Sequence, residues 1–258
     1  MTRPRRGLTR IAPTPSGFLH EGNVATFRAT ADLASELGLD LALRIDDADA
    51  ARSRPAYIED IFRVLDLLGI AWQVGPRTAT EFAAHWSQRH RTESYRQRLE
   101  QLRDGAVELY ACACSRRELG GAARGGCSGR CWERALVLRE GSTCLRVRVP
   151  PGTTVEVGGC AIDISDTIGD AVLWRRDDLP AYHLVSIVED AALGTTHIVR
   201  GADLLESSAF QIWLAQQMGA VSVAEAAYLH LPLILDADGA KLSKSQLGEH
   251  ARPWTLSP

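Results

Sequence analysis

Lysine is almost absent from this sequence of 258 residues. Only two lysines occur, Lys241 and Lys244, and the other basic residues are all arginine. Either residue can supply a solvated surface charge, but only lysine supplies a compact ammonium. Both lysines fall in the short segment Ala-Lys-Leu-Ser-Lys-Ser, so we interpret them as part of a site that needs the ammonium.

Long apolar runs are also missing. No run of the roughly eighteen apolar residues needed for a membrane span occurs, and the basic N-terminus lacks the apolar core of a signal peptide. We therefore expect a cytoplasmic protein that contacts no membrane. The formal net charge of −3 excludes a chain that is basic throughout, so any RNA contact must come from local arginine patches. The candidates are Arg3, Arg5 and Arg6, Arg89 and Arg91, and Arg116 and Arg117.

The N-terminal part alternates segments typical of strands and helices. Residues 8–13 and 39–45 are short apolar runs that predict strands. Residues 23–37 and 55–68 predict helices, the first with Asn23 as its N-cap and Gly38 as its stop. This βαβα order predicts an α/β fold with a parallel sheet of the Rossmann type.

The middle of the chain has a different composition. Residues 106–168 hold four clustered cysteines and many glycines, which favours a small insertion within the α/β domain. We therefore predict three parts: the first half of a catalytic domain (1–105), a zinc-bearing insertion (106–168) and the second half of the catalytic domain (169–258). In the last part we expect strands at 183–188, 196–199 and 228–235, a helix at 207–218 and a turn at 236–239. Since the chain ends soon after Lys244, we expect no large C-terminal domain.

A turn between the first strand and first helix is suited to phosphate binding. Its sequence from residue 12 to 23 is Ala-Pro-Thr-Pro-Ser-Gly-Phe-Leu-His-Glu-Gly-Asn. Backbone N–H groups and a helix N-terminus face a ligand at such a position in an α/β sheet. Gly22 allows close approach, and His20 and Asn23 offer neutral donors to phosphate oxygens. The alternative is a plain strand–turn–helix with an incidental histidine.

Lys241 and Lys244 form the second candidate phosphate site. Lys244 follows a glycine-bearing turn and can present an ammonium to an ATP phosphate. The two motifs stand at opposite ends of the sequence, as expected if they close on one nucleotide. The alternative for the lysine segment alone is a surface loop.

Four cysteines have the spacing of a metal site. Cys112 and Cys114 form one close pair, and Cys127 and Cys131 form another. Two such thiolate pairs suit tetrahedral Zn2+, whereas a Cys-x-Cys pair is poorly placed for a disulfide with itself. The alternative is four buried free thiols.

A third set of polar residues stands at predicted strand ends. An amino-acid substrate needs a carboxylate for its ammonium and guanidinium groups for its carboxylates. The charged residues that fit these needs are Arg10, Asp46, Asp47 and Arg200, and Tyr182 adds a hydroxyl group. Spacing alone does not join them, and each has an alternative role on the surface or in an ion pair.

These motifs together resemble the glutamyl-tRNA synthetase family of class I synthetases. His20-Glu21-Gly22-Asn23 is similar to the HIGH motif of that class, and the segment from Lys241 to Ser245 is similar to its KMSKS motif. The resemblance runs over nearly the whole chain, and the order of the motifs is highly specific. It implies a ligase that activates glutamate with ATP and Mg2+ on a Rossmann-type domain.

Within the family, the chain looks most like a short branch without an anticodon-binding domain. That branch has a zinc site in its insertion, and it passes activated glutamate to the queuosine base of tRNA(Asp). The resemblance implies that glutamate contacts Arg10, Thr14, Asp46, Tyr182 and Arg200. It implies that ATP contacts His20, Gly22, Asn23 and Lys244, with catalysis by His20, Asn23, Lys241 and Lys244.

The sequence departs from the family pattern at two places. Asp46 stands where bacterial members have the longer glutamate, and the tail after Lys244 is short. Two alternatives therefore stand beside transfer to tRNA(Asp): an enzyme that passes glutamate to a non-tRNA acceptor, and a non-catalytic nucleotide- or RNA-binding relative. We expect the chain to act as a monomer.

Overall fold

A computed structural model describes residues 6–105, 107–115, 118–119, 127, 131–233 and 253–255. The chain forms two compact units, and each is built from separate stretches of sequence. The first unit consists of Met1–Arg91, Thr195–Asp203 and Ala227–Pro258, and the second of Thr92–Gly194 and Leu204–Ala226. Among the described residues, no helix is long and apolar enough to cross a membrane.

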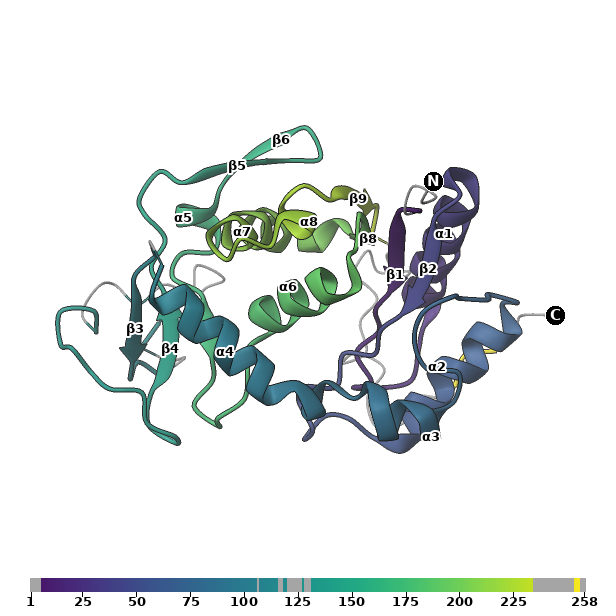
Figure 1. Cartoon of the computed structure of the whole chain (residues 1–258), viewed down its shortest axis with the longest axis horizontal. Helices are drawn as coiled ribbons and strands as arrows, with labels where there is room; N and C mark the ends of the chain where they lie inside the picture. The colour runs from purple at the N-terminus through teal and green to yellow at the C-terminus, as the bar shows by residue number, and fades with distance from the viewer. Residues whose placement is uncertain are drawn as a thin grey trace, which may run out of the picture. The chain divides into compact units, whose positions relative to one another are not determined.

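Two pairs of parallel strands form the centre of the first unit (Figure 1). β1 (Leu8–Ile11) pairs with β2 (Asp40–Leu43), and β8 (His197–Gly201) pairs with β9 (Ala227–Leu231). β1 lies beside β8, because the Thr196 amide donates to the Leu8 carbonyl at 2.9 Å. This parallel arrangement confirms the α/β prediction, and it brings the carboxyl ends of β1 and β8 to the same edge.

Helices α1 (Glu21–Leu37) and α2 (Pro55–Leu67) each bury an apolar face in the core of the first unit. The short helix α3 (Ala79–Glu81), which buries no residue, comes next, followed by a π-helical turn at Phe82–Trp86 and a 3-10 turn at Gln88–Arg91. Val24 and Phe27 of α1, Val64 and Leu65 of α2 and strand residue Leu43 share one apolar core. The predicted helix at 55–68 is confirmed, and its Pro55 occupies a first-turn position, where no N–H is needed.

The start of α1 differs from the sequence prediction. The helix begins at Glu21, and His20 is its N-cap; the prediction of Asn23 as N-cap is wrong. Histidine is an uncommon cap, but the Nδ1 atom of His20 accepts a hydrogen bond from the Gly22 amide at 3.1 Å. Gly38 ends the helix in the left-handed conformation, as predicted.

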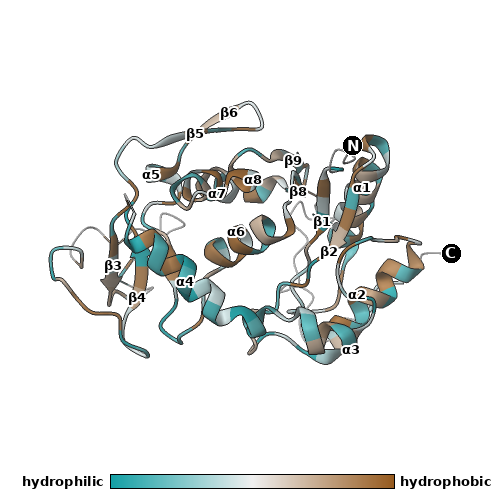
Figure 2. Cartoon of the chain, in the orientation of Figure 1, coloured by the Kyte–Doolittle hydropathy of each residue, from teal (hydrophilic) through white to brown (hydrophobic). Residues whose placement is uncertain are grey.

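The second unit combines a small antiparallel sheet with helices (Figure 1). β3 (Leu109–Cys112), β4 (Cys144–Val147) and β7 (Val172–Trp174) form the sheet, and β5 (Thr154–Val157) pairs with β6 (Cys160–Asp163) in a hairpin. The helices are α4 (Thr92–Arg103), α5 (Ile164–Thr167), α6 (Tyr182–Leu193), α7 (Leu205–Gln217) and α8 (Val221–Ala224). Figure 2 shows that α4 is largely hydrophilic, whereas α6 and α7 carry many hydrophobic residues.

The predicted strand at 183–188 is wrong, because these residues belong to α6. A short apolar run does not distinguish a buried strand from a buried helix. Here the helix continues past Glu189 and Asp190 to Leu193, and it ends at Gly194, which has φ 71°. Leu184, Val185 and Ile187 are all buried, so the segment is apolar on more than one side.

Candidate active site

The carboxyl end of β1 leads into α1 through a turn with its amides held by side chains. The Leu19 amide donates to Asp60 Oδ2 at 2.9 Å, and the His20 amide donates to Asn23 Oδ1 at 3.2 Å. Since His20 Nδ1 accepts a hydrogen bond from Gly22, the proton of the neutral imidazole is assigned to Nε2. The turn therefore presents His20 as a neutral donor at the N-terminus of a helix.

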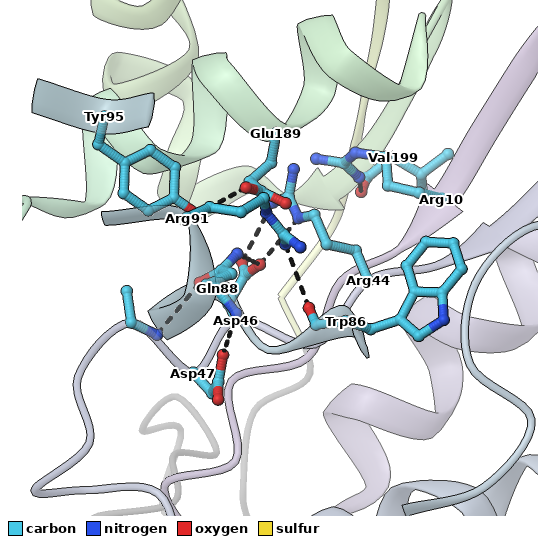
Figure 3. Close-up of polar contacts among 11 residues, drawn as sticks. Arg10, Arg44, Asp46, Asp47, Trp86, Gln88, Arg91, Tyr95, Glu189 and Val199 are labelled. Atoms are coloured by element: carbon cyan, nitrogen blue, oxygen red, sulfur yellow. Dashed lines mark hydrogen bonds and ion pairs between the residues drawn. The ribbon is translucent and has the colours of Figure 1, made fainter. Parts of the chain in front are cut away.

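Two arginines stand on neighbouring strands near this turn. Arg10, on β1, is buried, and its Nη1 lies 3.5 Å from the Val199 carbonyl of β8, as Figure 3 shows. Arg200, on β8, is also buried, and its guanidinium lies 5.6 Å from the centre of the Tyr228 ring. Thr14 follows β1 in the turn and is half-buried. The first unit thus brings two of the predicted guanidinium groups to adjacent strands.

Asp46 follows β2 and is held by a buried pair of donors. Its Oδ1 accepts hydrogen bonds from Arg44 Nε and from Gln88 Nε2, both at 2.8 Å, and its Oδ2 accepts from Arg44 Nη2 at 3.1 Å. The backbone amide of Asp46 donates to the Pro13 carbonyl at 2.9 Å, which ties this segment to the turn after β1. The Asp46 carboxylate is therefore held in one orientation by these donors (Figure 3).

Gln88 and Asp47 complete this network, and only Asp47 was singled out from the sequence. Gln88 Oε1 accepts from the Ala48 amide at 3.1 Å, so this amide side chain bridges Asp46 and Ala48. Asp47 is 1% exposed and accepts from the Ser87 hydroxyl at 2.6 Å and from the Gln88 amide at 2.8 Å. No sequence motif marks Gln88; in the structure it comes just after a π-helical turn, a feature often found at functional sites.

Other predicted site residues belong to the second unit or lie outside the described residues. Tyr182 belongs to the second unit, where it begins α6 rather than a strand and is 44% exposed. Lys241 and Lys244, with the turn at 236–239, lie outside the described residues. In the second unit, the buried Tyr95 hydroxyl donates to Glu189 Oε1 at 2.5 Å, a contact between distant residues that no local motif indicates (Figure 3).

His230 lies on β9, one strand from Arg200. Burial lowers the pKa of His230, the positive charge of Arg200 lowers it further, and Asp203 opposes both effects. The imidazole is therefore neutral at pH 7, which adds no positive charge to this edge of the sheet.

The four predicted metal ligands come together in the second unit. The Sγ atoms of Cys112, Cys114, Cys127 and Cys131 all lie within 4.8 Å of one another. The Sγ of Cys114 is 3.5 Å from that of Cys127 and 3.4 Å from that of Cys131. Zn–S bonds of about 2.3 Å in a tetrahedron place sulfur atoms roughly 3.8 Å apart, so the cluster fits zinc.

The surroundings of the cluster favour at least one thiolate. Burial opposes ionisation of Cys131, but hydrogen bonds from the Ala113 backbone and from the neighbouring thiols outweigh it and lower the pKa of Cys131 to about 7. Arg176 Nη2 donates to the Cys114 carbonyl. Cys144 is buried and Cys160 exposed, and neither belongs to the four-sulfur group.

Comparison with known proteins gives the family. The family model described as "tRNA synthetases class I (E and Q), catalytic domain" matches residues 8–251. A curated protein of Methylococcus capsulatus named glutamyl-Q tRNA(Asp) synthetase is 38% identical, over 97% of this chain and 78% of its own length. A protein of the same name from Verminephrobacter eiseniae is 39% identical, over 91% of this chain and 80% of its own length.

Solved structures agree with this match. The glutamate-tRNA synthetase of Elizabethkingia anophelis superposes with a TM-score of 0.74 at 26% identity over 96% of this chain. The chain spans 55% of the length of that synthetase. The matching catalytic-domain model and the named relatives together show that the chain belongs to the class I tRNA synthetases of the glutamyl and glutaminyl type, a family of ligases.

Proposed function

We propose that this protein activates glutamate with ATP and transfers it to the queuosine base of tRNA(Asp). The observation that carries the first step is the turn before α1, where His20 is a neutral Nε2 donor beside a helix N-terminus. The acceptor is proposed from the relatives, which are named glutamyl-Q tRNA(Asp) synthetase.

Activation needs alignment more than acid–base chemistry. The α-carboxylate of glutamate is itself the nucleophile, and it attacks the α-phosphorus of ATP as pyrophosphate leaves. Charge that builds on the phosphate oxygens is stabilised by fixed donors. We assign this role to His20 and Asn23, with Gly22 allowing close approach of the phosphates and with Lys241 and Lys244 as the cations. Mg2+ bound together with ATP would supply further positive charge to the phosphates.

Glutamate selection is proposed to use the residues on β1, β2 and β8. Arg10 and Arg200 would pair with carboxylates, and Thr14 would donate or accept one hydrogen bond. Asp46 would accept the substrate ammonium, with its shorter side chain held in place by Arg44 and Gln88. Tyr182, in the second unit, is proposed as a further substrate contact.

We also propose that residues 106–168 form an insertion that holds a structural Zn2+. The four sulfur atoms of Cys112, Cys114, Cys127 and Cys131 support this assignment by their mutual distances. Metal analysis of the purified protein should find one zinc per chain. Because structural zinc contributes to folding, Cys112→Ser should lose the metal and unfold this region. Undamaged protein without zinc would contradict the proposal.

The experiment for the function separates its two steps. Exchange of labelled pyrophosphate into ATP, measured without tRNA, should depend on glutamate but not on glutamine or aspartate. The enzyme is then incubated with labelled glutamate, ATP and tRNA(Asp) with or without queuosine. Label on the queuosine-containing tRNA alone supports the proposal.

Each other result has a defined meaning. Label on both RNAs indicates ordinary charging of the terminal ribose. Label on neither, with exchange intact, indicates a non-tRNA acceptor. Binding of ATP without any exchange indicates a non-catalytic relative.

A further inference from the structure

The segment 253–255 contacts two helices of the first unit through one tryptophan. Trp254 Nε1 donates to Glu21 Oε2 at 2.5 Å, and the Trp254 carbonyl accepts from Arg63 Nη2 at 2.6 Å. The Trp254 ring is half-buried and packs against the apolar core that α1 and α2 share. Glu21 is the residue directly after His20, so the tryptophan contacts the phosphate-binding turn itself.

A second route leads from Trp254 to the same turn. Arg63 also donates to Asp60 Oδ1, at 2.7 Å from Nη2 and 3.1 Å from Nε. Asp60 is 3% exposed, and its other oxygen, Oδ2, accepts from the Leu19 amide at 2.9 Å. The polar chain therefore runs from the Trp254 carbonyl through Arg63 and Asp60 to the residue before His20.

We propose that Arg63, Asp60 and Trp254 form a clamp of positioning residues that fixes the His20 turn for ATP. The proposal rests on the function proposed above. The clamp holds the turn on both sides of His20, through the Leu19 amide on one side and the Glu21 carboxylate on the other. No member of the clamp is assigned a contact with ATP or glutamate.

The clamp matters because the position of His20 Nε2 relative to the phosphate must be accurate. A displacement of a catalytic group by about 1 Å can lower the rate about a hundredfold. Charge-assisted hydrogen bonds to a buried carboxylate are the stronger kind and have fixed directions. The buried Asp60 carboxylate accepts such bonds at both oxygens, at Oδ2 from the Leu19 amide and at Oδ1 from Arg63.

The test uses Arg63→Met and Trp254→Phe. The first keeps an unbranched side chain and removes all three hydrogen bonds of Arg63, and the second keeps an aromatic ring and removes only the donor to Glu21. We expect kcat of glutamate-dependent pyrophosphate exchange to fall about tenfold or more in Arg63→Met, with the KM for glutamate unchanged. Trp254→Phe should lower kcat in the same direction by less.

Two control variants separate positioning from lost stability. Val64→Ala removes buried methyl groups from the same helix without touching the polar chain. Arg52→Met breaks an exposed ion pair with Asp49 of the same i,i+3 spacing as Arg63 and Asp60. Both controls should keep the wild-type kcat per folded molecule. Equal losses of kcat in Val64→Ala and Arg63→Met, or no loss in Arg63→Met, would overturn the clamp.

A measurement that does not depend on catalysis tests the clamp separately from the proposed function. Hydrogen exchange of the Leu19 amide should be about tenfold or more faster in Asp60→Asn and Arg63→Met than in Arg52→Met, because a charge-assisted bond is weakened. If the wild type shows no glutamate-dependent exchange of pyrophosphate, the proposed function fails while this measurement still decides the clamp. Unchanged protection of Leu19 in both variants would refute it.

Discussion

Asp47→Ala is expected to cost more stability than an ordinary charged-to-alanine change. Asp47 is buried, and its two oxygens accept separate hydrogen bonds, from the Ser87 hydroxyl and the Gln88 amide. Hydrogen bonds to a charged group contribute about 1.5–3 kcal/mol each, so their loss sums to about 3–6 kcal/mol. The pair with Arg89, at 3.4 Å and half-exposed, adds little.

The change should also reach the proposed glutamate site. Gln88 bridges Asp46 and Ala48, and its backbone amide is one of the two donors that Asp47 fixes. Asp47→Ala therefore frees Gln88 to shift, and we expect the KM for glutamate to rise in the exchange assay. Urea unfolding gives the free energy of unfolding, and exchange kinetics at low temperature give the KM of the folded fraction.

Asp177→Ala is the matched control. Asp177 forms an ion pair with Arg175 at 2.5 Å on the surface, where about 0–1 kcal/mol is typical. If Asp47→Ala loses no more stability than Asp177→Ala, the buried network contributes little and the reasoning is wrong. If Asp47→Ala loses much stability but leaves the KM unchanged, the hydrogen bonds of Asp47 stabilise the fold, but they do not position Asp46 through Gln88.

Three further outcomes follow from single sites. Arg10→Met should raise the KM for glutamate about tenfold or more in the exchange assay, because a charge-assisted bond to a substrate carboxylate is lost; an unchanged KM would remove Arg10 from the site. Gly75→Ala should lower the free energy of unfolding in urea by more than about 1 kcal/mol, because Gly75 has φ 112° and an added Cβ would lie 2.3 Å from the Leu43 carbonyl oxygen. Gly38→Ala is the control and should cost less, because Gly38, at φ 62°, has open space around an added Cβ. Burial and Arg200 lower the pKa of His230 in the folded protein, so its contribution to stability is present above a pH of about 6.5 and is lost as the pH falls below it. In His230→Gln, the free energy of unfolding in urea should therefore change less between pH 5 and pH 7, by about the contribution of one titrating group. An identical pH slope in the variant would contradict the assignment.

The parts of the fold that sequence predicted well have strong local signals. Pro55 and the helical spacing that follows it define α2, and Gly38 ends α1 where expected. The α6 segment was mistaken for a strand because helix and strand look alike when a run is apolar on most sides. His20 was missed as a cap because histidine caps by its ring nitrogen, a use that residue preferences do not favour.

The candidate site likewise contains residues that the sequence predicted and residues that only the structure revealed. The four cysteines stand in two spaced pairs, and the cluster came together as the spacing predicted. Arg10 and Asp46 were predicted from their places at strand ends and from the family resemblance, and their roles stay predictions. Gln88 bonds to Asp46 across a separation of 42 positions, and Asp60 bonds to Leu19 across 41. Contacts over such separations depend on how helices pack, and no short pattern in one sequence encodes them.

The interleaving of the two units has a consequence for synthesis on the ribosome. The chain passes between the units four times, and β8, the neighbour of β1, begins 186 residues after β1 ends. At translation rates of about 5–20 residues per second, the edge of β1 waits roughly 10–40 seconds for its partner. During that time one edge of β1 stands without its β8 neighbour, and an unpaired strand edge is the kind of surface that chaperones bind and that promotes aggregation at high expression. Slow growth at low temperature with ample chaperone should therefore raise the soluble yield.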